Sequence, residues 1–204
     1  MKILIVYYSM YGHVLKLARA AAEGAQTVPG AEVVLRRVQE LDSNLSKLQG
    51  SKHAQDVLAQ QQDIRIATME DLQAADGIIF GTPTRYGNMC AQMKQYIDGT
   101  GDLWLSGALE GKPAGVMVST ATTHGGQETT CLTMMAPLLH LGFIIVGVPY
   151  STPGMLHTEG RGGTPYGATT VAGGQNQLEP APEDLSIAKA LGRRVADVAK
   201  KLRG

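Results

Sequence analysis

The feature that most constrains the fold is an unbroken apolar run near the start of the chain, Ile3–Tyr8, which leads directly into a turn. The run does not alternate apolar with polar residues, which is typical of a strand buried on both faces of a parallel sheet. Immediately after the turn, apolar residues recur at helical spacing, at Val14, Ala18 and Ala25. The chain therefore begins with a buried strand and an amphipathic helix over residues 13–27.

The alternation of strand and helix continues along the chain. Further strands are predicted at 31–38, 77–80, 114–118 and 143–148, and further helices at 69–75, 89–97, 127–141 and 185–202. Such alternation favours an α/β fold with a parallel sheet and helices on both faces. With five strands and no Gly-x-Gly-x-x-Gly turn after the first, we expect the flavodoxin-like, doubly wound order 2-1-3-4-5.

Two segments depart from this pattern. Residues 39–68 are polar with weak periodicity and are expected to form a variable insertion of helix and loop, whereas residues 149–182 hold many glycines and no clear period. A length of 204 residues still suits one flavodoxin-like domain over residues 1–204. Because long irregular segments are uncommon unless functional, we hypothesise that residues 161–174 wrap a neighbouring subunit and complete its site.

The overall composition limits the classes of partner. Basic and acidic residues number 18 each, and a formal net charge of zero removes the simplest electrostatic case for nucleic acid or an anionic membrane. No stretch reaches the roughly 18 apolar residues of a membrane helix. The two cysteines, Cys90 and Cys131, cannot build a disulfide scaffold, which suits a reducing compartment. We expect a soluble, cytoplasmic protein without nucleic-acid partners or stable membrane insertion.

Three polar loops are predicted to meet where the strand order reverses. In open α/β sheets, ligands bind beyond the carboxyl ends of the strands at that point, and the first, third and fourth strands end there. The three loops are rich in hydroxyls, glycine and uncommitted backbone amides. They are Ser9, Met10, Tyr11, Gly12, His13 and Val14, then Thr82, Pro83, Thr84, Arg85, Tyr86 and Gly87, and then Ser119, Thr120, Ala121, Thr122, Thr123, His124, Gly125 and Gly126.

Each loop also has a purely structural interpretation. The first leads into a helix whose N-terminus suits a phosphate, but the same residues describe a capping turn. Arg85 can neutralise a phosphate or a reduced ring, or it is an ordinary solvated arginine. The glycines Gly125 and Gly126 suit the face of a planar heterocycle or a flexible connection. The coincidence of all three loops at one edge is what favours a ligand site.

The remaining side chains offer little reactive chemistry of their own. The histidines have no metal-ligand spacing, the cysteines form no Cys-x-x-Cys, and no Gly-x-Ser-x-Gly is present, so we predict neither a metal site nor a hydrolase triad. His140 lies among leucines, where a core role and a catalytic role are both open. Trp104 suits packing, an oligomer contact or the wall of an aromatic substrate site. Such a pattern is expected where a cofactor carries the reaction.

Five sequence segments, spread over nearly the whole chain, support a cofactor-dependent function. They are Tyr7–His13, Ile79–Met89, Leu103–Trp104 with Ser106–Leu109, Gly125–Glu128 and Arg161–Thr170. At matching positions these segments resemble the WrbA-type NAD(P)H:quinone oxidoreductases, a branch of the flavodoxin-like flavoproteins. The resemblance implies non-covalently bound FMN and the two-electron reduction of a quinone by NADH or NADPH. Because hydride transfer needs nicotinamide and flavin face to face, we predict that NAD(P)H and quinone enter one crevice in turn, in a ping-pong reaction.

The resemblance also implies roles for the loops. Ser9–Val14 should hold the phosphate, and Thr82–Gly87 with Ser119–Gly126 should hold the isoalloxazine and the ribityl chain. His140 should sit over the flavin as the catalytic residue. Two residues should contact substrates, Tyr11 the nicotinamide cofactor and Trp104 the shared substrate space. A homotetramer whose sites borrow residues across subunits is expected.

Two other classes of function remain open from the sequence. One is a flavodoxin-type one-electron carrier, although the zero net charge and the additional 149–182 segment count against it. The other is an interaction protein that keeps the flavodoxin-like fold without catalysing turnover.

Overall fold

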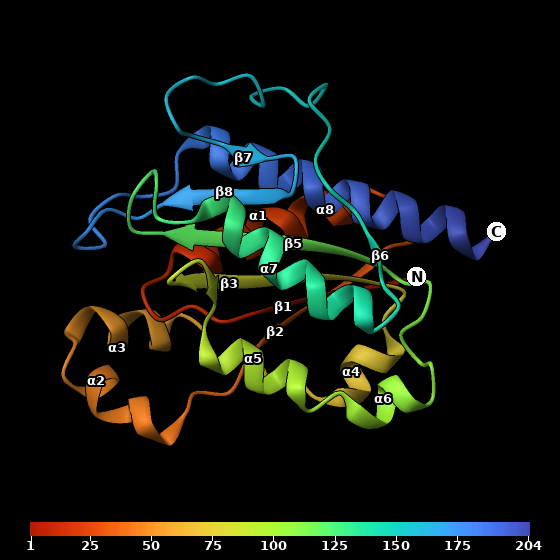
Figure 1. The fold of residues 1–204 in the computed structure, drawn as a ribbon, viewed down its shortest axis with the longest axis horizontal. Coiled ribbons are helices and arrows are strands. Elements are labelled where there is room, and N and C mark those ends of the chain that lie inside the picture. Colours follow the sequence, from red (N-terminus) through yellow and green to blue (C-terminus); the bar gives the residue numbers. More distant parts are fainter.

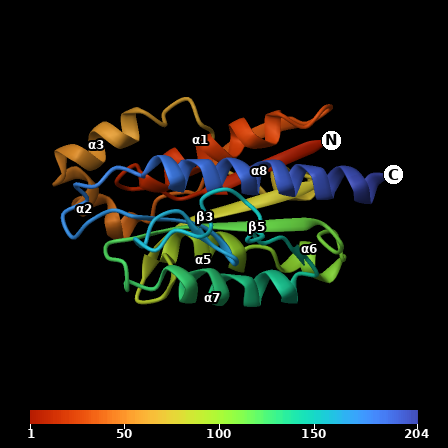
Figure 2. The same cartoon turned by 90° about the horizontal axis from the view of Figure 1, so that it is seen from above.

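The computed structural model describes residues 1–204 and contains a mostly parallel, eight-stranded sheet between two layers of helices (Figure 1 and Figure 2). Along the main path the order is β2-β1-β3-β5-β8-β7, with β4 paired to β3 and β6 paired to β5. The strands are β1 (Lys2–Tyr7), β2 (Glu32–Arg37), β3 (Gly77–Arg85), β4 (Asn88–Met89), β5 (Pro113–Thr120), β6 (Ile144–Ile145), β7 (Gly163–Thr164) and β8 (Gly167–Val171). The flavodoxin-like order of the principal strands is confirmed.

The helices lie on both faces of this sheet, as Figure 2 shows. Helices α1 and α8 pack on one face, and α4, α5 and α7 on the other. Their bounds, with those of the smaller elements, are α1 (His13–Gln26), η1 (Asp42–Asn44), α2 (Leu45–Gln49), α3 (Lys52–Ala59), α4 (Met69–Ala74), α5 (Ala91–Asp98), α6 (Gly101–Leu105), α7 (Gln127–His140) and α8 (Pro182–Arg203). The insertion at 39–68 contains η1, α2 and α3, in agreement with a segment of helix and loop.

Strand β1 explains the apolar run with which the chain begins. Leu4 and Val6 belong to the core under α5 and α7, whereas Ile5 and Tyr7 belong to the core under α1 and α8. All four are at most 1% exposed. Both faces of β1 are therefore buried from solvent, and a polar residue at any of these positions would be buried as well.

Helices α1 and α8 approach each other at two glycines. A Cβ atom on Gly24 would lie 1.9 Å from the carbonyl oxygen of Lys189, and one on Gly192 would lie 1.9 Å from that of Ala21. No side chain fits at either position, so the two backbones are in direct contact. This contact fixes α8, the helix predicted at 185–202, against α1, the helix predicted at 13–27.

The fifth strand of the sheet is split, which corrects two expectations. The strand predicted at 143–148 is only the two-residue β6, paired with Pro113 and Ala114 of β5. The chain then leaves the sheet and returns as β8, which pairs with Met117–Thr120 on the same edge of β5. Residues 149–182 therefore contain regular structure, and at β8 they complete this chain's own sheet.

The second predicted loop, residues 82–87, is also more regular than expected. Strand β3 continues to Arg85, turns through Tyr86 (φ 53°) and Gly87 (φ 77°), and returns as the antiparallel β4. Positive φ angles at both turn positions match a tight hairpin. Pro83 and the flanking threonines concealed this extension because they interrupt the apolar run. None of the helices combines the length and apolarity needed to cross a bilayer.

Candidate functional site

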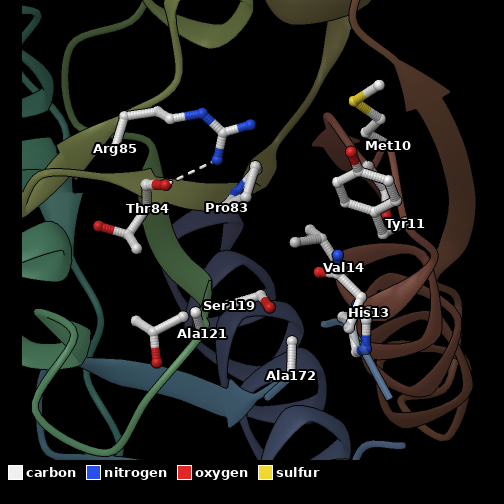
Figure 3. Close-up of a pocket in the computed structure, with 13 residues that line it drawn as sticks. Met10, Tyr11, His13, Val14, Pro83, Thr84, Arg85, Ser119, Ala121 and Ala172 are labelled. Carbon is white, nitrogen blue, oxygen red and sulfur yellow. Dashed lines mark hydrogen bonds between the residues drawn. The ribbon is translucent and has the colours of Figure 1, made fainter. Parts of the chain in front are cut away.

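One pocket lies where β1, β3 and β5 end, and loops from all three strands line it (Figure 3). Met10 and Tyr11 face Thr84 and Arg85 across the cavity in that view. The lining residues are Ser9, Met10, Tyr11, His13, Val14, Pro83, Thr84, Arg85, Ser119, Thr120, Ala121, Ala172 and Asn176. The predicted convergence of the three loops on one place is therefore confirmed.

The first loop offers backbone donors rather than charged side chains. Gly12 adopts a left-handed conformation (φ 92°) at the start of α1, and its N–H donates to Ser9 Oγ at 3.2 Å. The N–H groups of Tyr11, His13 and Val14 have no acceptor within the protein. Free N–H groups at the positive end of a helix dipole form an anion site, so this corner of the pocket suits a phosphate.

His13 fastens a distant segment beside that corner. Its ring is buried, 6% exposed, and Nε2 lies 2.9 Å from the carbonyl oxygen of Leu178. Burial lowers the pKa of His13, although the Leu178 carbonyl partly opposes the shift, so a neutral ring with Nε2–H donating is favoured. An ion pair between Lys16 and Glu179 lies alongside. These contacts hold the segment that supplies Asn176 to the pocket.

The second loop brings a fixed positive charge. Arg85 is exposed, and its Nη1 donates to the Thr84 carbonyl oxygen at 2.8 Å, the hydrogen bond drawn in Figure 3. Thr84 Oγ1 lies 2.7 Å from Thr130 Oγ1 and accepts the Gly87 N–H at 3.2 Å. Arg85 is the only lysine or arginine among the lining residues. The cation is therefore available to an anionic ligand opposite Tyr11.

The third loop closes against the second. Ser119 and Thr120 are buried at the end of β5, and the Ala172 N–H donates to the Thr120 carbonyl oxygen at 2.7 Å. A Cβ atom on Gly126 would lie 3.1 Å from Gly87 Cα, so the two loops touch through glycines. This contact joins the two walls that lie across the pocket from the first loop.

Several predicted site residues do not line this pocket. Thr82 is fully buried, and its hydroxyl accepts the Cys90 N–H at 3.1 Å and donates to the Pro83 carbonyl. Tyr86 is fully exposed at the hairpin tip. The other residues outside the pocket are Gly12, Gly87, Thr122, Thr123, His124, Gly125 and Gly126. Gly12 shapes the pocket through its backbone, and contacts of the others with a cofactor stay predictions.

His140 and Trp104 lie away from the pocket within one chain. At 1.5 Å per residue, the fourteen residues of α7 place His140 about 20 Å from the end of the helix that reaches the third loop. Trp104 is 59% exposed and belongs to α6, a helix near the end of the molecule where the strands begin (Figure 1). Their predicted places above the cofactor and at the substrate therefore require another subunit.

Two lining residues, Ala172 and Asn176, were not predicted. Both follow β8, and their position depends on the path of the 149–182 segment. Asn176 takes a left-handed conformation (φ 59°), which asparagine tolerates better than most residues. A turn signal of this kind indicates a loop but does not indicate which site the loop reaches.

The pocket as a whole fits a flat, phosphorylated ligand. The phosphate corner has unpaired N–H donors, and hydroxyl-bearing and backbone groups from the other two loops face it across the cavity. FMN combines these features in one molecule, with a phosphate at one end and a planar ring at the other. The donor set therefore fits FMN.

Comparisons with known proteins agree with this geometry. A family model described as NADPH-dependent FMN reductase matches residues 1–154. Two relatives named NAD(P)H dehydrogenase (quinone) match over the full length of both chains, one from Geobacter sulfurreducens at 53% identity and one from Solidesulfovibrio magneticus at 50%. A WrbA-like flavodoxin structure from Agrobacterium tumefaciens has a TM-score of 0.65 at 25% identity and covers 98% of each chain.

A more distant structure supports the fold alone. An archaeal flavodoxin at 18% identity has a TM-score of 0.60 and covers 100% of both chains. The full-length relatives carry the assignment to a family. Over its full length the chain is similar to proteins named NAD(P)H dehydrogenase (quinone). It belongs to the family described as NADPH-dependent FMN reductase, in the WrbA-like branch of that family.

Proposed function

We propose that the protein is an FMN-dependent NAD(P)H:quinone oxidoreductase that reduces quinones to hydroquinones by two electrons. The observation that carries this proposal is the pocket that loops from β1, β3 and β5 line together, with unpaired N–H donors at the start of α1. The name shared by the full-length relatives supports the choice of nicotinamide donor and quinone.

The chain's own residues position the cofactor. The N–H groups of Tyr11, His13 and Val14 hold the phosphate, with Ser9 beside them. Arg85 supplies the positive charge that offsets negative charge on a bound ligand. Thr84 and the backbone of residues 119–121 would hold the ring and its side chain. Bound FMN supplies the redox chemistry, in which two electrons pass from NAD(P)H to a quinone in two half-reactions.

We propose that both substrates reach this pocket next to Tyr11, which we expect to contact the nicotinamide cofactor. Hydride transfer requires reacting atoms about 3–3.5 Å apart, so donor and quinone compete for the same face and bind in turn. A ping-pong mechanism follows, and initial-rate plots at varied NADH and quinone should give parallel lines.

We further propose a homotetramer whose subunits complete one another's sites. Trp104 is 59% exposed, Leu105 79% and Leu139 60%, so α6 and the last turn of α7 present large apolar side chains beside His140. A neighbouring subunit covering this surface brings His140 and Trp104 to a pocket that one chain leaves without them. The zero net charge and two buried free cysteines suit a cytoplasmic protein with small-molecule substrates.

A visible spectrum tests the proposed activity. Purified protein should retain added FMN after gel filtration, lose the yellow colour on anaerobic addition of NADH, and regain it on addition of benzoquinone. Accumulation of a stable one-electron-reduced species supports a one-electron carrier instead. Protein that fails to retain FMN supports a non-catalytic role. Intersecting initial-rate lines would contradict the ping-pong mechanism while leaving the quinone reduction intact.

A further inference from the structure

One face of the 39–68 insertion lies against the first loop of the pocket. His53 and Val57 are on α3, and Gln61 follows directly after its last turn. The three are spaced by four residues and therefore project on one side of the helix. Figure 1 shows α3 at the end of the molecule where the strands finish, and the pocket is lined by loops at that same end.

Each of these residues contacts a different part of the loop. The His53 ring stacks on the Tyr11 ring with centroids 6.0 Å apart and planes 6° apart, and His53 Nε2 lies 3.3 Å from the Tyr11 carbonyl oxygen. Val57, 3% exposed, packs behind Gly12, where a Cβ atom would lie 3.4 Å from Val57 Cγ2.

Gln61 makes the most buried of the three contacts. It is a polar side chain only 3% exposed, and its Nε2 donates to the Ser9 carbonyl oxygen at 3.1 Å. Burying an amide is unfavourable unless it is hydrogen-bonded, so this bond fixes the position of both partners. The Arg19 guanidinium donates to the Gln60 carbonyl oxygen at 3.0 Å and ties the end of α3 to α1.

The loop has little internal structure to hold it in place. Its one internal hydrogen bond runs from the Gly12 N–H to Ser9 Oγ, while the N–H groups of Tyr11, His13 and Val14 point to no acceptor. Donors can be aimed at a phosphate only if the backbone that carries them is fixed from behind. The packing of His53, Val57 and Gln61 supplies that support.

We propose that α3 and the adjacent Gln61 form a brace, a rigid support packed behind the first loop of the pocket. In this brace Gln61 positions the phosphate donors, and His53 positions Tyr11 toward the nicotinamide substrate. The inference rests on the proposed function and assigns a role to an insertion otherwise expected only to vary. Gln61 and His53 are positioning residues, because neither lines the pocket. They should affect different binding steps.

The Gln61 contact is tested by FMN affinity, measured by quenching of flavin fluorescence with cofactor-free protein. Gln61→Ala should raise the FMN dissociation constant about fivefold, the effect of one hydrogen bond of ~1 kcal/mol. Gln62→Ala is the matched control, because Gln62 is the adjacent exposed glutamine. If Gln61→Ala does not fold, Gln61→Met retains the side-chain length and removes the donor. Equal FMN affinities for the Gln61 and Gln62 variants overturn this part of the proposal.

The His53 contact is tested by separating KM from kcat. His53→Ala should raise KM for NADH about three- to tenfold, as expected for loss of an aromatic pair, with kcat within twofold of wild type and the FMN dissociation constant raised less than in Gln61→Ala. His53→Phe keeps a flat ring and should restore KM. A wild-type KM in His53→Ala, or an equal loss in both variants, overturns the positioning role of His53.

Failure of the brace is distinguishable from failure of the proposed function. Wild-type protein that does not bind FMN refutes the proposed function alone. Amide exchange at Gly12, measured by NMR without cofactor, then still tests the brace. Exchange should be faster in Gln61→Ala than in Gln62→Ala, and equal rates overturn the brace whatever the cofactor.

Discussion

Gly12 shows how a single residue shapes the pocket without lining it. Its φ of 92° is a conformation that costs an L-residue about 1–2 kcal/mol, and it directs the following N–H groups of α1 toward the cavity. The side chains of this loop carry no fixed charge. At this scale the binding corner consists of backbone geometry, which explains why its residues are small or neutral.

Gly12→Ala should therefore lower both stability and FMN affinity. The expected loss of folding free energy is about 1 kcal/mol from the backbone conformation. Gly30→Ala is the matched control, because Gly30 also has a positive φ (83°) but an added Cβ would meet nothing within 4 Å. Urea denaturation should show similar losses in the two variants, whereas an FMN titration should weaken only in Gly12→Ala. Equal FMN affinities would contradict the role of the loop.

Glu40 should make stability depend on pH. Burial raises the pKa of Glu40, but hydrogen bonds from Tyr8 Oη, Gln92 Nε2, the Leu41 N–H and Asn44 Nδ2 outweigh it and hold the pKa below its usual range. The stabilisation is fully present above the unfolded pKa of about 4.3 and is lost as the pH falls through the lower folded value.

Glu40→Gln should accordingly cost about 1 kcal/mol at pH 7, a value kept small because solvent reaches this half-buried group. The difference from wild type should shrink in urea denaturation near pH 3. Asp42→Asn, at an exposed position two residues away, should change stability little at either pH. A Glu40→Gln deficit that stays constant with pH would show that the carboxylate charge is not involved.

At the scale of elements, helix α8 contacts both α1 and the 149–182 segment. It crosses α1 at Gly24 and Gly192, and Asp184 in its first turn accepts a hydrogen bond from the Gly162 N–H in the 149–182 segment, which also supplies residues to the pocket. The contact between α1 and α8 thus supports the helix whose first turn forms the phosphate corner.

Gly24→Ala and Gly192→Ala should each destabilise the protein by about 1–3 kcal/mol, although alanine favours helix by about 1 kcal/mol. The cause is the carbonyl oxygen 1.9 Å from each added Cβ. Gly101→Ala in α6 should be neutral or stabilising, because an added Cβ there meets nothing within 4 Å. Thermal denaturation measures all three, and unchanged melting temperatures in the first two would refute the close crossing.

Asp184→Asn should loosen the segment that supplies the pocket. The buried carboxylate accepts the N–H groups of Gly162 and Ala181 and the Thr170 hydroxyl, at 2.6 Å for the last. Loss of these charge-assisted bonds should cost about 2 kcal/mol in urea denaturation. Asp197→Asn, on a more exposed turn of the same helix, should change stability by less than about 0.5 kcal/mol.

Some of these elements can be predicted from the sequence and others cannot. Strand β1, α1 and α8 follow from periodicity, because each buries an apolar run or stripe. Strand β8 does not, since Gly167–Val171 is short and rich in small and hydroxyl residues, and its partner β5 lies far along the chain. The three pocket loops follow from the rule that ligands bind at strand ends.

Other parts of the site required the three-dimensional path. Ala172 and Asn176 reach the pocket only because β8 returns beside β5, and Gln61 only because α3 packs behind the first loop. Family resemblance indicates His140 and Trp104 as site residues, but neither touches the pocket of its own chain. A contact between subunits leaves no periodic signal in one sequence.

At the scale of the whole molecule, every layer packs on the same sheet. Two large hydrophobic clusters lie on its opposite faces, and β1, β3 and β5 contribute residues to both. We propose on this basis that residues 1–204 form one cooperative domain. Urea unfolding followed by Trp104 fluorescence and by far-ultraviolet circular dichroism should give coincident transitions, whereas separate midpoints would indicate an independently folding segment.

The two ends of the strand order have a consequence for how copies of the protein meet. Strand β2 carries Glu32, Arg36 and Arg37, and its outer side is partly covered by a bridge from Arg37 to Ile66. The opposite margin is the two-residue β7. The charged side chains on β2 and the shortness of β7 make both margins poor templates for strand addition and fibril growth. In the proposed tetramer, the contacts between subunits therefore fall to side chains on helices, which would let assembly stop at a defined size.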